Sequence, residues 1–506
     1  MVRIYLRVQT MKHFKRTALA SVINLALFGI PDAHADTEAL ERRIRELESR
    51  LEKLDRAGAL SAKPAAAAPE VEKLSRKVNT LERKLELQDE VTTGALQKLP
   101  VFDAGADGFK ITSSDKKHQV RIRGAAQTDG RFYVEDNGFK GTDKFQLKQA
   151  RIWIEGYFFK DIYYKIMPDF AAGSNILPDA YLDYAYHPAV NLLVGKFKPS
   201  ISLERLQGDS DGTFLERAFP TYLASNRDVG IQIHGAFAKP GFKAETVAGP
   251  IDTKNTFTYQ IGVTNGSGDD GSPNNDSPDT DDNKEVNGRL FAHPFHHTGY
   301  SWLEGLGLGV AGSFGNPDKQ ALKAQATPLG RSTYLDYTKV NTGFAAPTSD
   351  GATYRIYPQA YWFAGPFGAI GEYVVSSQHL VSGKTDIQQK NTAWQILASY
   401  VLTGEDNSFA GVKPIRNFDP LKGNWGALQL AARYSELDVD DATFKIIDPN
   451  QSASKAKAWT VGANWYLNSN AVIRADYENV SFDGGAARGR DLANEQVFAT
   501  RFQLAF

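Results

Sequence analysis

The chain ends in the stretch ATRFQLAF (residues 499–506), in which apolar and polar side chains alternate up to the last residue. One face of this segment carries Phe498, Thr500, Phe502, Leu504 and Phe506. The other face carries Arg501 and Gln503. A period of two predicts a β-strand with one apolar face. Because an open last strand would leave an unpaired edge, we expect this strand to close a barrel by pairing with the first strand.

The same alternation recurs from residue 105 to the C-terminus, in segments separated by Gly, Asn, Asp and Pro. The segment HQVRIRGAA sets Val120 and Ile122 against Arg121 and Arg123. In NLLVGKFK we expect an apolar face of Leu193 and Phe197 and a polar face of Lys196 and Lys198. A soluble sandwich would bury the apolar faces in a core, whereas a membrane barrel would turn them to lipid.

Three features favour the membrane barrel. Aromatic residues lie near the ends of the segments, where interfacial girdles need them. Connections alternate between short and long, and the chain ends inside a strand. About 400 residues at about 25 per strand and connection give about 16 strands, which is wide enough for a water-filled lumen. We therefore predict an all-β fold: an antiparallel transmembrane β-barrel over residues 105–506, preceded by a short α-helical coiled coil.

The N-terminus resembles a secretory leader. From Met11 the chain has a basic segment with Lys12, Lys15 and Arg16, then an apolar stretch over 17–30. The sequence Ala33-His34-Ala35 fits a cleavage site, so we expect residues 1–35 to be removed after Ala35. The ten residues before Met11 are interpreted as an N-terminal extension. An exported chain with a barrel is expected in the outer membrane of a Gram-negative bacterium.

Residues 36–92 carry two heptad seams. The first contains Leu40, Ile44, Leu47, Leu51 and Leu54, and the second Val71, Leu74, Val78, Leu81 and Leu85. An Ala/Pro linker over 57–70 separates them, because a helix does not run through Pro64 unbroken. Each seam is short, so association of several copies is the expected source of stability, and the segment is placed in the periplasm. A single amphipathic helix packed on another domain remains the alternative.

The composition excludes several kinds of site. The chain has no Cys, which excludes disulfides and thiolate chemistry, and its net charge is −1, which gives no general attraction to nucleic acid. We find no catalytic motif, and expect neither an enzyme nor a cofactor. The acidic stretch over 266–285 lacks the spacing of a calcium loop, so we expect a solvated loop there and no metal site.

Basic residues gather on the face that the alternation assigns to the lumen. The candidate pore-lining and anion-binding residues are Arg121, Arg123, Arg151, Lys165, Lys196, Lys198, Arg289, Arg355, Arg433, Arg474 and Arg501. Guanidinium groups stay charged and replace part of the hydration shell of an anion, and several weak sites in series let it leave. Some acids on the same face, such as Glu372 and Asp476, are expected to pair with arginines. A lumen of mixed charge without selectivity is therefore the alternative.

Several segments together resemble the phosphate-selective porin O/P family over residues 115–506. They include VRIRGAAQTDGRFY, FQLKQARIWIEGYFFKDIYYKIMPDFA, LPDAYLDYAYHPAVNLLVGKFKPSISLERL and ANWYLNSNAVIRADYENV. The resemblance implies a 16-stranded trimeric outer-membrane channel whose third loop folds into the lumen as a constriction. By position this loop covers about residues 199–226, with Ser200, Ser202, Arg205 and Arg217 as candidate constriction residues. The terminal Phe506 also resembles the signal read by the outer-membrane assembly machinery.

One departure from the family bears on the substrate. Phosphate-specific members carry a second-strand stretch richer in arginine, whereas this chain reads FQLKQAR, with Lys148 and Gln149 at two of those positions. We expect passive diffusion of small anions, with phosphate, pyrophosphate or polyphosphate as substrates. The alternatives are a weakly selective general porin and a barrel-anchored coiled coil with a structural role in the envelope. Lipid, inorganic anions and two further copies of the chain are the expected partners.

Overall fold

The computed structural model describes residues 33–60, 68–96, 98–134, 141–171, 177–245, 255–266 and 281–506. The chain divides into two compact units, residues 1–100 and 101–506. The leader predicted over 1–35 lies outside the described residues except for Ala33, His34 and Ala35, which begin the first described helix. Residues 61–67 of the predicted linker and 267–280 of the acidic loop also lie outside them.

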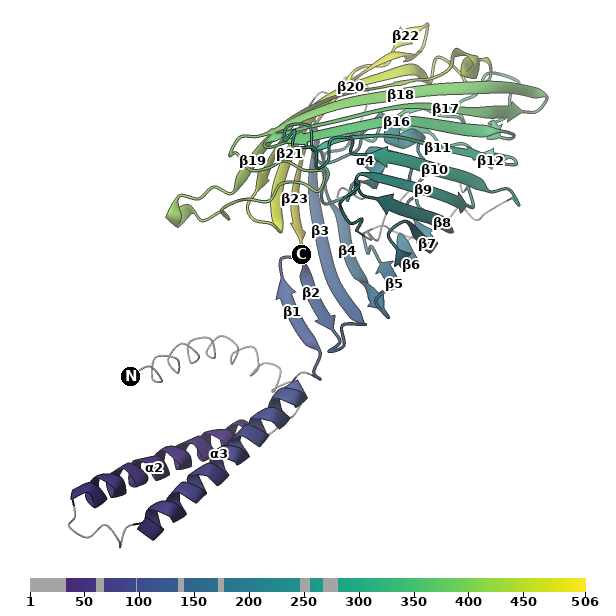
Figure 1. The fold of residues 1–506 in the computed structure, drawn as a ribbon. Coiled ribbons are helices and arrows are strands. Elements are labelled where there is room, and N and C mark those ends of the chain that lie inside the picture. Colours follow the sequence, from purple (N-terminus) through teal and green to yellow (C-terminus); the bar gives the residue numbers. More distant parts are fainter. Residues whose placement is uncertain are drawn as a thin grey trace. The chain divides into compact units, whose positions relative to one another are not determined.

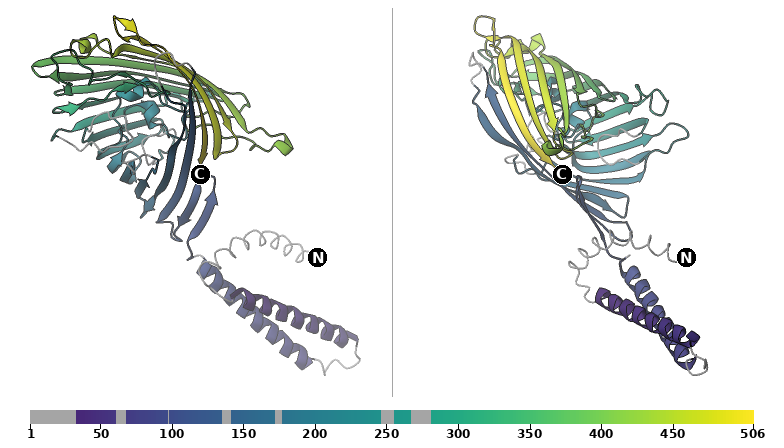
Figure 2. Two further views of the ribbon diagram at one scale, coloured as in Figure 1. Left: turned by 180° about the vertical axis from the view of Figure 1, so that it is seen from behind. Right: turned by 90° about the vertical axis from the view of Figure 1, so that its left-hand side faces the viewer.

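The first unit contains two helices, α2 (Ala33–Leu60) and α3 (Ala68–Leu96), which lie side by side in Figures 1 and 2. Ile44 and Val78, one from each heptad seam, are buried. Leu47 and Leu74 of the same seams stay partly exposed. None of the described helices is long and apolar enough to cross a membrane. A coiled coil between copies of the chain remains a prediction.

The second unit is a closed antiparallel barrel with 16 strands among the described residues. These are β3 (Gln119–Tyr133), β4 (Lys144–Phe158), β5 (Ile162–Met167), β6 (Asp179–His187), β7 (Val190–Phe197), β8 (Asp228–Phe237), β9 (Phe257–Thr264), β10 (Glu285–Ala292), β11 (Leu306–Gly315), β16 (Thr353–Ala364), β17 (Phe367–Ser382), β18 (Thr385–Val401), β19 (Ala427–Asp438), β20 (Ala453–Tyr466), β21 (Ala471–Ala486) and β23 (Glu495–Ala505). Each pairs with the next in this order, which confirms the predicted barrel and its strand number.

The last strand closes the barrel against the first. Strand β23 pairs with β3 from Val497 opposite Tyr133 to Ala505 opposite Ala125. Figure 2 shows these yellow C-terminal strands beside the blue β3. The backbone N–H of Phe506 donates to Gly124 O at 2.9 Å, and Gly124 N–H donates to Phe506 O at 2.8 Å. The segment from Val497 to Phe506 is thus paired with β3, so this side of the last strand leaves no free edge.

A small hairpin extends the sheet beyond the chain end. Strands β1 (Val101–Gly105) and β2 (Gly108–Thr112) pair with each other, and β2 pairs with the start of β3, where Phe109 lies opposite Ile122. The Phe109 ring meets the Phe506 ring edge-on, with 6.2 Å between their centroids. The second unit therefore begins at Val101, ahead of residue 105, where alternation suggested that the barrel starts.

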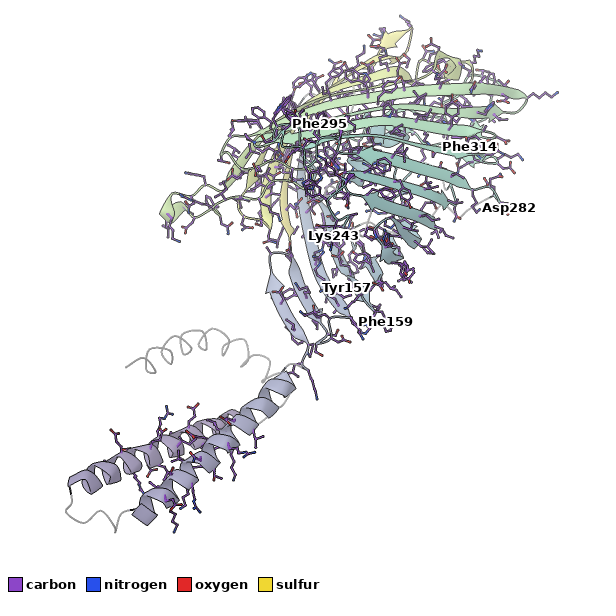
Figure 3. All side chains as sticks on the ribbon, viewed as in Figure 1. Tyr157, Phe159, Lys243, Asp282, Phe295 and Phe314 are labelled. Atoms are coloured by element: carbon purple, nitrogen blue, oxygen red, sulfur yellow. The ribbon has the colours of Figure 1, made fainter. Side chains whose placement is uncertain are left out.

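The outward face is apolar and bears two aromatic girdles. We call the end of the barrel at Phe506 the terminus end and the opposite end the loop end. The loop-end girdle runs through paired strands as Phe132, Phe498, Tyr477, Trp459, Tyr434, Trp394 and Tyr373. At the terminus end, Phe158 stacks on Tyr164 and Phe367 packs against Tyr400. Figure 3 shows Phe159 just beyond β4 at the terminus end, and Phe314 in β11.

The spacing of the two girdles matches a membrane. Phe498 on β23 belongs to the loop-end girdle, and Phe506, directly after β23, lies at the terminus end. About 26 Å of strand separates them, and a tilt of about 40° projects this to about 20 Å, close to the apolar band of known barrels. Hydrocarbon is therefore the natural solvent of the exposed side chains between the girdles, such as Phe502.

Candidate functional site

Residues between β7 and β8 fold into the barrel and carry the short helices α4 (Leu203–Leu206) and η1 (Phe219–Leu223). Figure 1 shows α4 among the strands of the barrel. We call residues 199–226 the inserted loop, and most of its side chains are buried. The sequence places it here because Pro199 cannot continue the ladder of β7 and Ser202 caps α4, accepting a hydrogen bond from Arg205 N at 3.3 Å.

The far wall of the barrel holds the backbone of the inserted loop. Glu372 on β17 accepts from Leu203 N–H at 2.9 Å, and Asp476 on β21 accepts from Leu215 N–H at 2.7 Å. Arg501 on β23 donates to Leu215 O at 3.0 Å. Glu372 and Asp476 therefore anchor the loop, which corrects the expectation that they chiefly neutralise arginines.

A cavity of about 250 Å³ lies between the inserted loop and the wall formed by β3, β4 and β23. We call it the basic chamber. Its charged lining comprises seven cations and four carboxylates among the described residues: Lys148, Arg151, Arg205, Arg217, Arg227, Arg331, Arg501, Asp169, Glu204, Asp209 and Glu216. Arg227 and Arg501 also pair with Asp179 and Asp129 outside the lining, but basic groups still outnumber acidic ones, so the chamber is a candidate anion site.

Asp209 of the inserted loop is the centre of one charge cluster in the chamber. Arg151 and Arg217 form ion pairs with its carboxylate, and Arg227 lies 4.0 Å from it. Burial alone would raise the pKa of Asp209, but the surrounding basic groups hold it well below its ordinary value. This loop carboxylate is therefore charged throughout the physiological range and occupies part of the basic lining.

Glu216 of the inserted loop is the centre of the second cluster. Lys148 Nζ lies 2.7 Å and Arg131 Nη2 lies 3.3 Å from its Oε1 atom, and Arg331 pairs with the other oxygen. Burial opposes its charge, yet Arg331, Lys148 and their neighbours lower the pKa of Glu216 below its ordinary value. Lys148, which departs from the family pattern, thus lies in the chamber and engages this carboxylate.

Other predicted residues line the approach from the terminus end. Two cavities of about 410 and 550 Å³ adjoin the basic chamber through Gly208. Arg123 lines both, and Lys165 lines the smaller one. Arg123 Nε lies 2.9 Å from Glu155, which also pairs with Arg121. The predicted Arg121, Arg123, Arg151 and Lys165 are therefore brought together along one side of the inner wall.

The remaining arginines on the wall serve the loop or lie apart from the chamber. Arg433 reaches Glu204 at 3.2 Å, and Arg474 donates to Ser210 O at 2.7 Å. Arg289 contacts Gln359 at 3.0 Å and covers the Phe291 ring.

Within the inserted loop and at Lys198 just before it, the predicted side chains mainly support the fold. Lys198 donates to Arg205 O at 2.8 Å, and Ser200 donates to Gln232 at 3.3 Å. Arg205 binds Asn226 at 2.8 Å and Thr221 O at 2.5 Å, which joins the two ends of the loop. Of the four predicted constriction residues, Arg205 and Arg217 line the basic chamber, and Ser200 and Ser202 do not.

Lys196 lies on the outer face, so the prediction that it lines the pore is wrong. It lies opposite Ala180 and Val229, and Val229 is exposed on the outer face, so Lys196 shares that face and does not line the lumen. Leu193 and Phe197 are buried on the inner face, where they pack with Tyr181. The alternation assigned β7 in the wrong phase because its inner positions are apolar, packed beside the inserted loop.

A second segment, between β11 and β16, also folds into the barrel. Its hairpin of β13 (Gln325–Ala326) and β14 (Thr333–Leu335) buries Leu329, Tyr334 and Leu335. Leu329 N–H donates to Glu478 on β21 at 2.7 Å. No periodic pattern in the sequence marked this segment, and it supplies Arg331 to the chamber.

An apolar cluster joins the two inserted segments, so part of the lumen that was predicted to hold water is packed with side chains. It contains Ile201, Phe219, Leu223, Tyr334, Leu335, Ile446 and Ile447 with the inner-face residues Tyr357, Val374, Leu380, Leu437, Val480 and Phe482. These strand positions are apolar because they pack against loops and do not face solution. Among the described residues, polar lining is concentrated beside the basic chamber and toward the terminus end.

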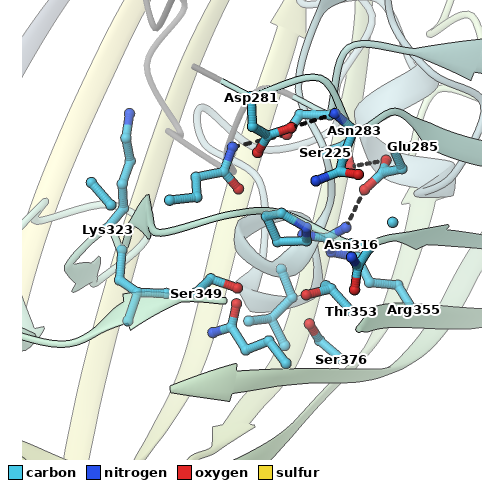
Figure 4. Close-up of a pocket in the computed structure, with 18 of the residues that line it drawn as sticks. Ser225, Asp281, Asn283, Glu285, Asn316, Lys323, Ser349, Thr353, Arg355 and Ser376 are labelled. Carbon is cyan, nitrogen blue, oxygen red and sulfur yellow. Dashed lines mark hydrogen bonds and ion pairs between the residues drawn. The ribbon is translucent and has the colours of Figure 1, made fainter. Parts of the chain in front are cut away.

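A smaller polar cavity of about 50 Å³ lies at the loop end, drawn in Figure 4. Glu285 accepts from Ser225 at 2.6 Å and from Arg355 at 2.5 Å. Arg355, a predicted pore residue, is therefore paired here and apart from the basic chamber. Among the described residues, no group of three or more acidic, His or Cys side chains is placed to share a metal ion.

Sequence reasoning missed three basic residues near the chamber. Arg131 continues the odd-numbered series of Arg121 and Arg123 along β3, so the alternation could have identified it. Arg227 directly precedes β8, and Arg331 lies in a connection, so neither has a periodic signal. Their roles depend on contacts between segments far apart in the chain.

The chain is similar to a protein family, to a curated relative and to several solved structures. The family model described as phosphate-selective porin O and P matches residues 120–506. Porin O of Pseudomonas aeruginosa is 25% identical over 438 residues, covering 79% of this chain and 91% of that protein. Among solved structures, the outer membrane channel DcaP of Acinetobacter baumannii has a TM-score of 0.48 at 13% identity, covering 79% of this chain and 100% of that one. The Pseudomonas putida OprB structure has a TM-score of 0.49 at 10% identity, covering 78% and 95%.

The family match extends over most of the chain and includes all the strands of the barrel except the first residue of β3. It confirms the resemblance found in the sequence, and it indicates a channel and not an enzyme. The chain therefore belongs to the phosphate-selective porin O and P family of outer-membrane channels.

Proposed function

We propose that this porin conducts small anions by passive diffusion, with phosphate and pyrophosphate or polyphosphate as its substrates. The observation that carries the proposal is the basic chamber, where seven cations face four carboxylates beside the inserted loop. Guanidinium groups donate directed hydrogen bonds to an oxyanion that has shed part of its water. The description of the family as phosphate-selective supports phosphate as the substrate.

The proposed path connects the chamber with the terminus end. Arg123 lies in the wide cavities near the terminus, and Gly208 and Asp209 separate the smaller of these from Arg151. An anion moving along this side passes from partly exposed basic groups to buried ones. Several such groups in series attract the anion without a single deep site, which favours conduction over trapping.

The experiment is a phosphate titration of chloride current through the purified protein in a planar bilayer. If the chamber binds phosphate, added phosphate lowers the chloride current in a saturable way, and sulfate at the same ionic strength lowers it less. A chloride current that does not change with phosphate would contradict the phosphate site. Replacing Arg217 with Gln removes a partly exposed chamber cation while Asp209 keeps Arg151, and is expected to weaken the block.

A weakly selective channel is the second candidate, and specific contacts favour it. The chamber cations Lys148, Arg151 and Arg217 each pair with a carboxylate of the chain. Where the family pattern has arginine, Gln149 lies with its amide 3.0 Å from the Arg151 guanidinium. In this case the reversal potential under a KCl gradient would lie near zero and phosphate would not block.

For the assembly, we propose a homotrimer in the outer membrane of a Gram-negative bacterium. The leader would direct export, and Phe506 would be read by the assembly machinery. Residues 36–92 would form a periplasmic coiled coil, which the partly exposed Leu47 and Leu74 favour. Deleting residues 36–92 tests a structural role: loss of envelope integrity with intact conductance would support anchoring by this segment.

A further inference from the structure

Glu216 holds the position that an anionic solute would take in the basic chamber. Its carboxylate is only 7% exposed and contacts basic side chains from three separate parts of the chain. Arg131 comes from β3 and Lys148 from β4. Arg331 comes from the segment between β11 and β16. Cationic donors that converge from three directions on two oxygens form an oxyanion site, and here the occupant belongs to the protein.

The three cations exceed the charge of their occupant. One carboxylate supplies a single negative charge, whereas Arg131, Lys148 and Arg331 supply three positive charges. A phosphate dianion would match this charge better, and it has more oxygens to accept the available donors. A tethered carboxylate, however, competes at an effective concentration of about millimolar or higher, because it never leaves the site.

We propose that Glu216 is a built-in competitor that occupies the oxyanion site of Arg131, Lys148 and Arg331 and has to be displaced by a permeating phosphate. This inference rests on the proposed conduction of anions. The displaced carboxylate remains on the inserted loop and returns when the phosphate moves on. Residence is thereby shortened, which resolves the conflict between attracting a multivalent anion and releasing it.

The contacts of the inserted loop suit this role. Loop backbone on both sides of Glu216 is fixed by the wall: Leu215 N–H donates to Asp476, and the Glu216 carbonyl accepts from Arg433 at 2.9 Å. The side chain alone has to move for an anion to enter. Arg331 is the most exposed of the three cations, with 40% of its side chain accessible, so entry is expected from its side.

The test compares two isosteric variants in planar bilayers. Glu216→Gln removes the competing charge, whereas the control Glu285→Gln removes another buried Glu that pairs with an arginine, Arg355, away from the chamber. We expect Glu216→Gln to lower the half-blocking phosphate concentration at least tenfold and Glu285→Gln to leave it within twofold of wild type. Adding Lys148→Gln to Glu216→Gln should remove the gain.

Assembly is followed by the heat-dependent gel mobility of the folded barrel. If Glu216→Gln does not assemble, Glu216→Asp serves instead, because it keeps the charge but withdraws the carboxylate by one methylene. We expect it to bind phosphate more tightly than wild type. The proposal would be overturned if the half-blocking phosphate concentration of Glu216→Gln stays within twofold of wild type. The same outcome for Glu216→Asp would overturn it where that variant is used instead.

The wild-type reversal potential separates this inference from the proposed function. If the wild-type channel prefers chloride over potassium, but phosphate blocks Glu216→Gln at the same concentration as Glu285→Gln, only the competitor role fails. If wild type shows no anion preference, conduction of anions fails and the competitor role fails with it.

Discussion

At the scale of single residues, the inner wall of this porin is a network of charge pairs. Arg151 contacts Asp169 at 3.0 Å and pairs with Asp209, and it is only 7% exposed. Arg501 holds Asp129 at 2.7 Å. The alternation of the sequence predicted the inward direction of both arginines. It could not predict their acidic partners, because Asp209 lies in a loop and Asp129 on a different strand from Arg501.

Replacing Arg151 by Gln is predicted to destabilise the barrel. The change leaves Asp169 without its basic partner in a buried site, whereas Asp209 keeps Arg217, and breaking a buried pair costs about 3–5 kcal/mol. Chemical unfolding followed by gel mobility measures the effect. Arg123→Gln is the comparison, because the Arg123 side chain is 35% exposed and Arg121 remains on Glu155. A loss of stability for Arg151→Gln no larger than that for Arg123→Gln would contradict the buried network.

Tyr334 offers a second test at this scale. Its ring is buried in the apolar cluster, and its hydroxyl has no hydrogen-bond partner among the described residues. Tyr334→Ala is expected to cost about 3–5 kcal/mol through the cavity it leaves. Tyr334→Phe should be neutral or slightly stabilising, because it removes an unsatisfied polar group. Equal stability of the two variants, measured by unfolding, would show that this segment does not pack inside the barrel.

At the scale of elements, the register of neighbouring strands leaves no room for side chains at particular glycines. A Cβ on Gly156 of β4 would lie 1.9 Å from the backbone oxygen of Gln119. A Cβ on Gly371 of β17 would have no neighbour closer than 4.0 Å. The sequence showed both as interruptions of the alternation, and only the strand pairing distinguishes them.

We predict that Gly156→Ala lowers stability by about 1–3 kcal/mol, because β3 and β4 have to separate locally. Gly371→Ala should leave stability unchanged or raise it slightly, since alanine restricts the unfolded chain. The fraction of folded barrel after refolding into detergent reports both. A folded fraction for Gly156→Ala equal to that for Gly371→Ala would show that the β3–β4 register is different.

The element scale also shows where sequence reasoning was limited. Strand number, the closing strand and the position of the inserted loop followed from period, connection length and family resemblance. The phase of β7 did not, because Leu193 and Phe197 are apolar yet face inward. Alternation reports which face is polar only where one face meets water, and the inserted segments replace water with side chains along part of the wall.

At the scale of the whole molecule, the barrel depends on lipid as the solvent of its outer face. Phe502 lies midway between Phe498 and Phe506 and is exposed, while Phe145 is exposed near the loop-end girdle, edge-on to Phe132. Phe502→Lys should cost about 2–4 kcal/mol near the membrane centre, and Phe145→Lys about 0–1 kcal/mol near the interface. Folding into liposomes measures both costs, and equal costs would place the hydrocarbon elsewhere on the barrel.

The whole molecule also determines the sign of its selectivity, because the basic chamber and the cavities at the terminus end act in series. The most direct measurement is the reversal potential of the wild-type channel under a KCl gradient in a planar bilayer. We predict a potential on the chloride side, moved toward zero by Arg217→Gln. A wild-type potential at zero or on the potassium side would contradict it, because the excess positive charge of the chamber would then not face the permeating ions.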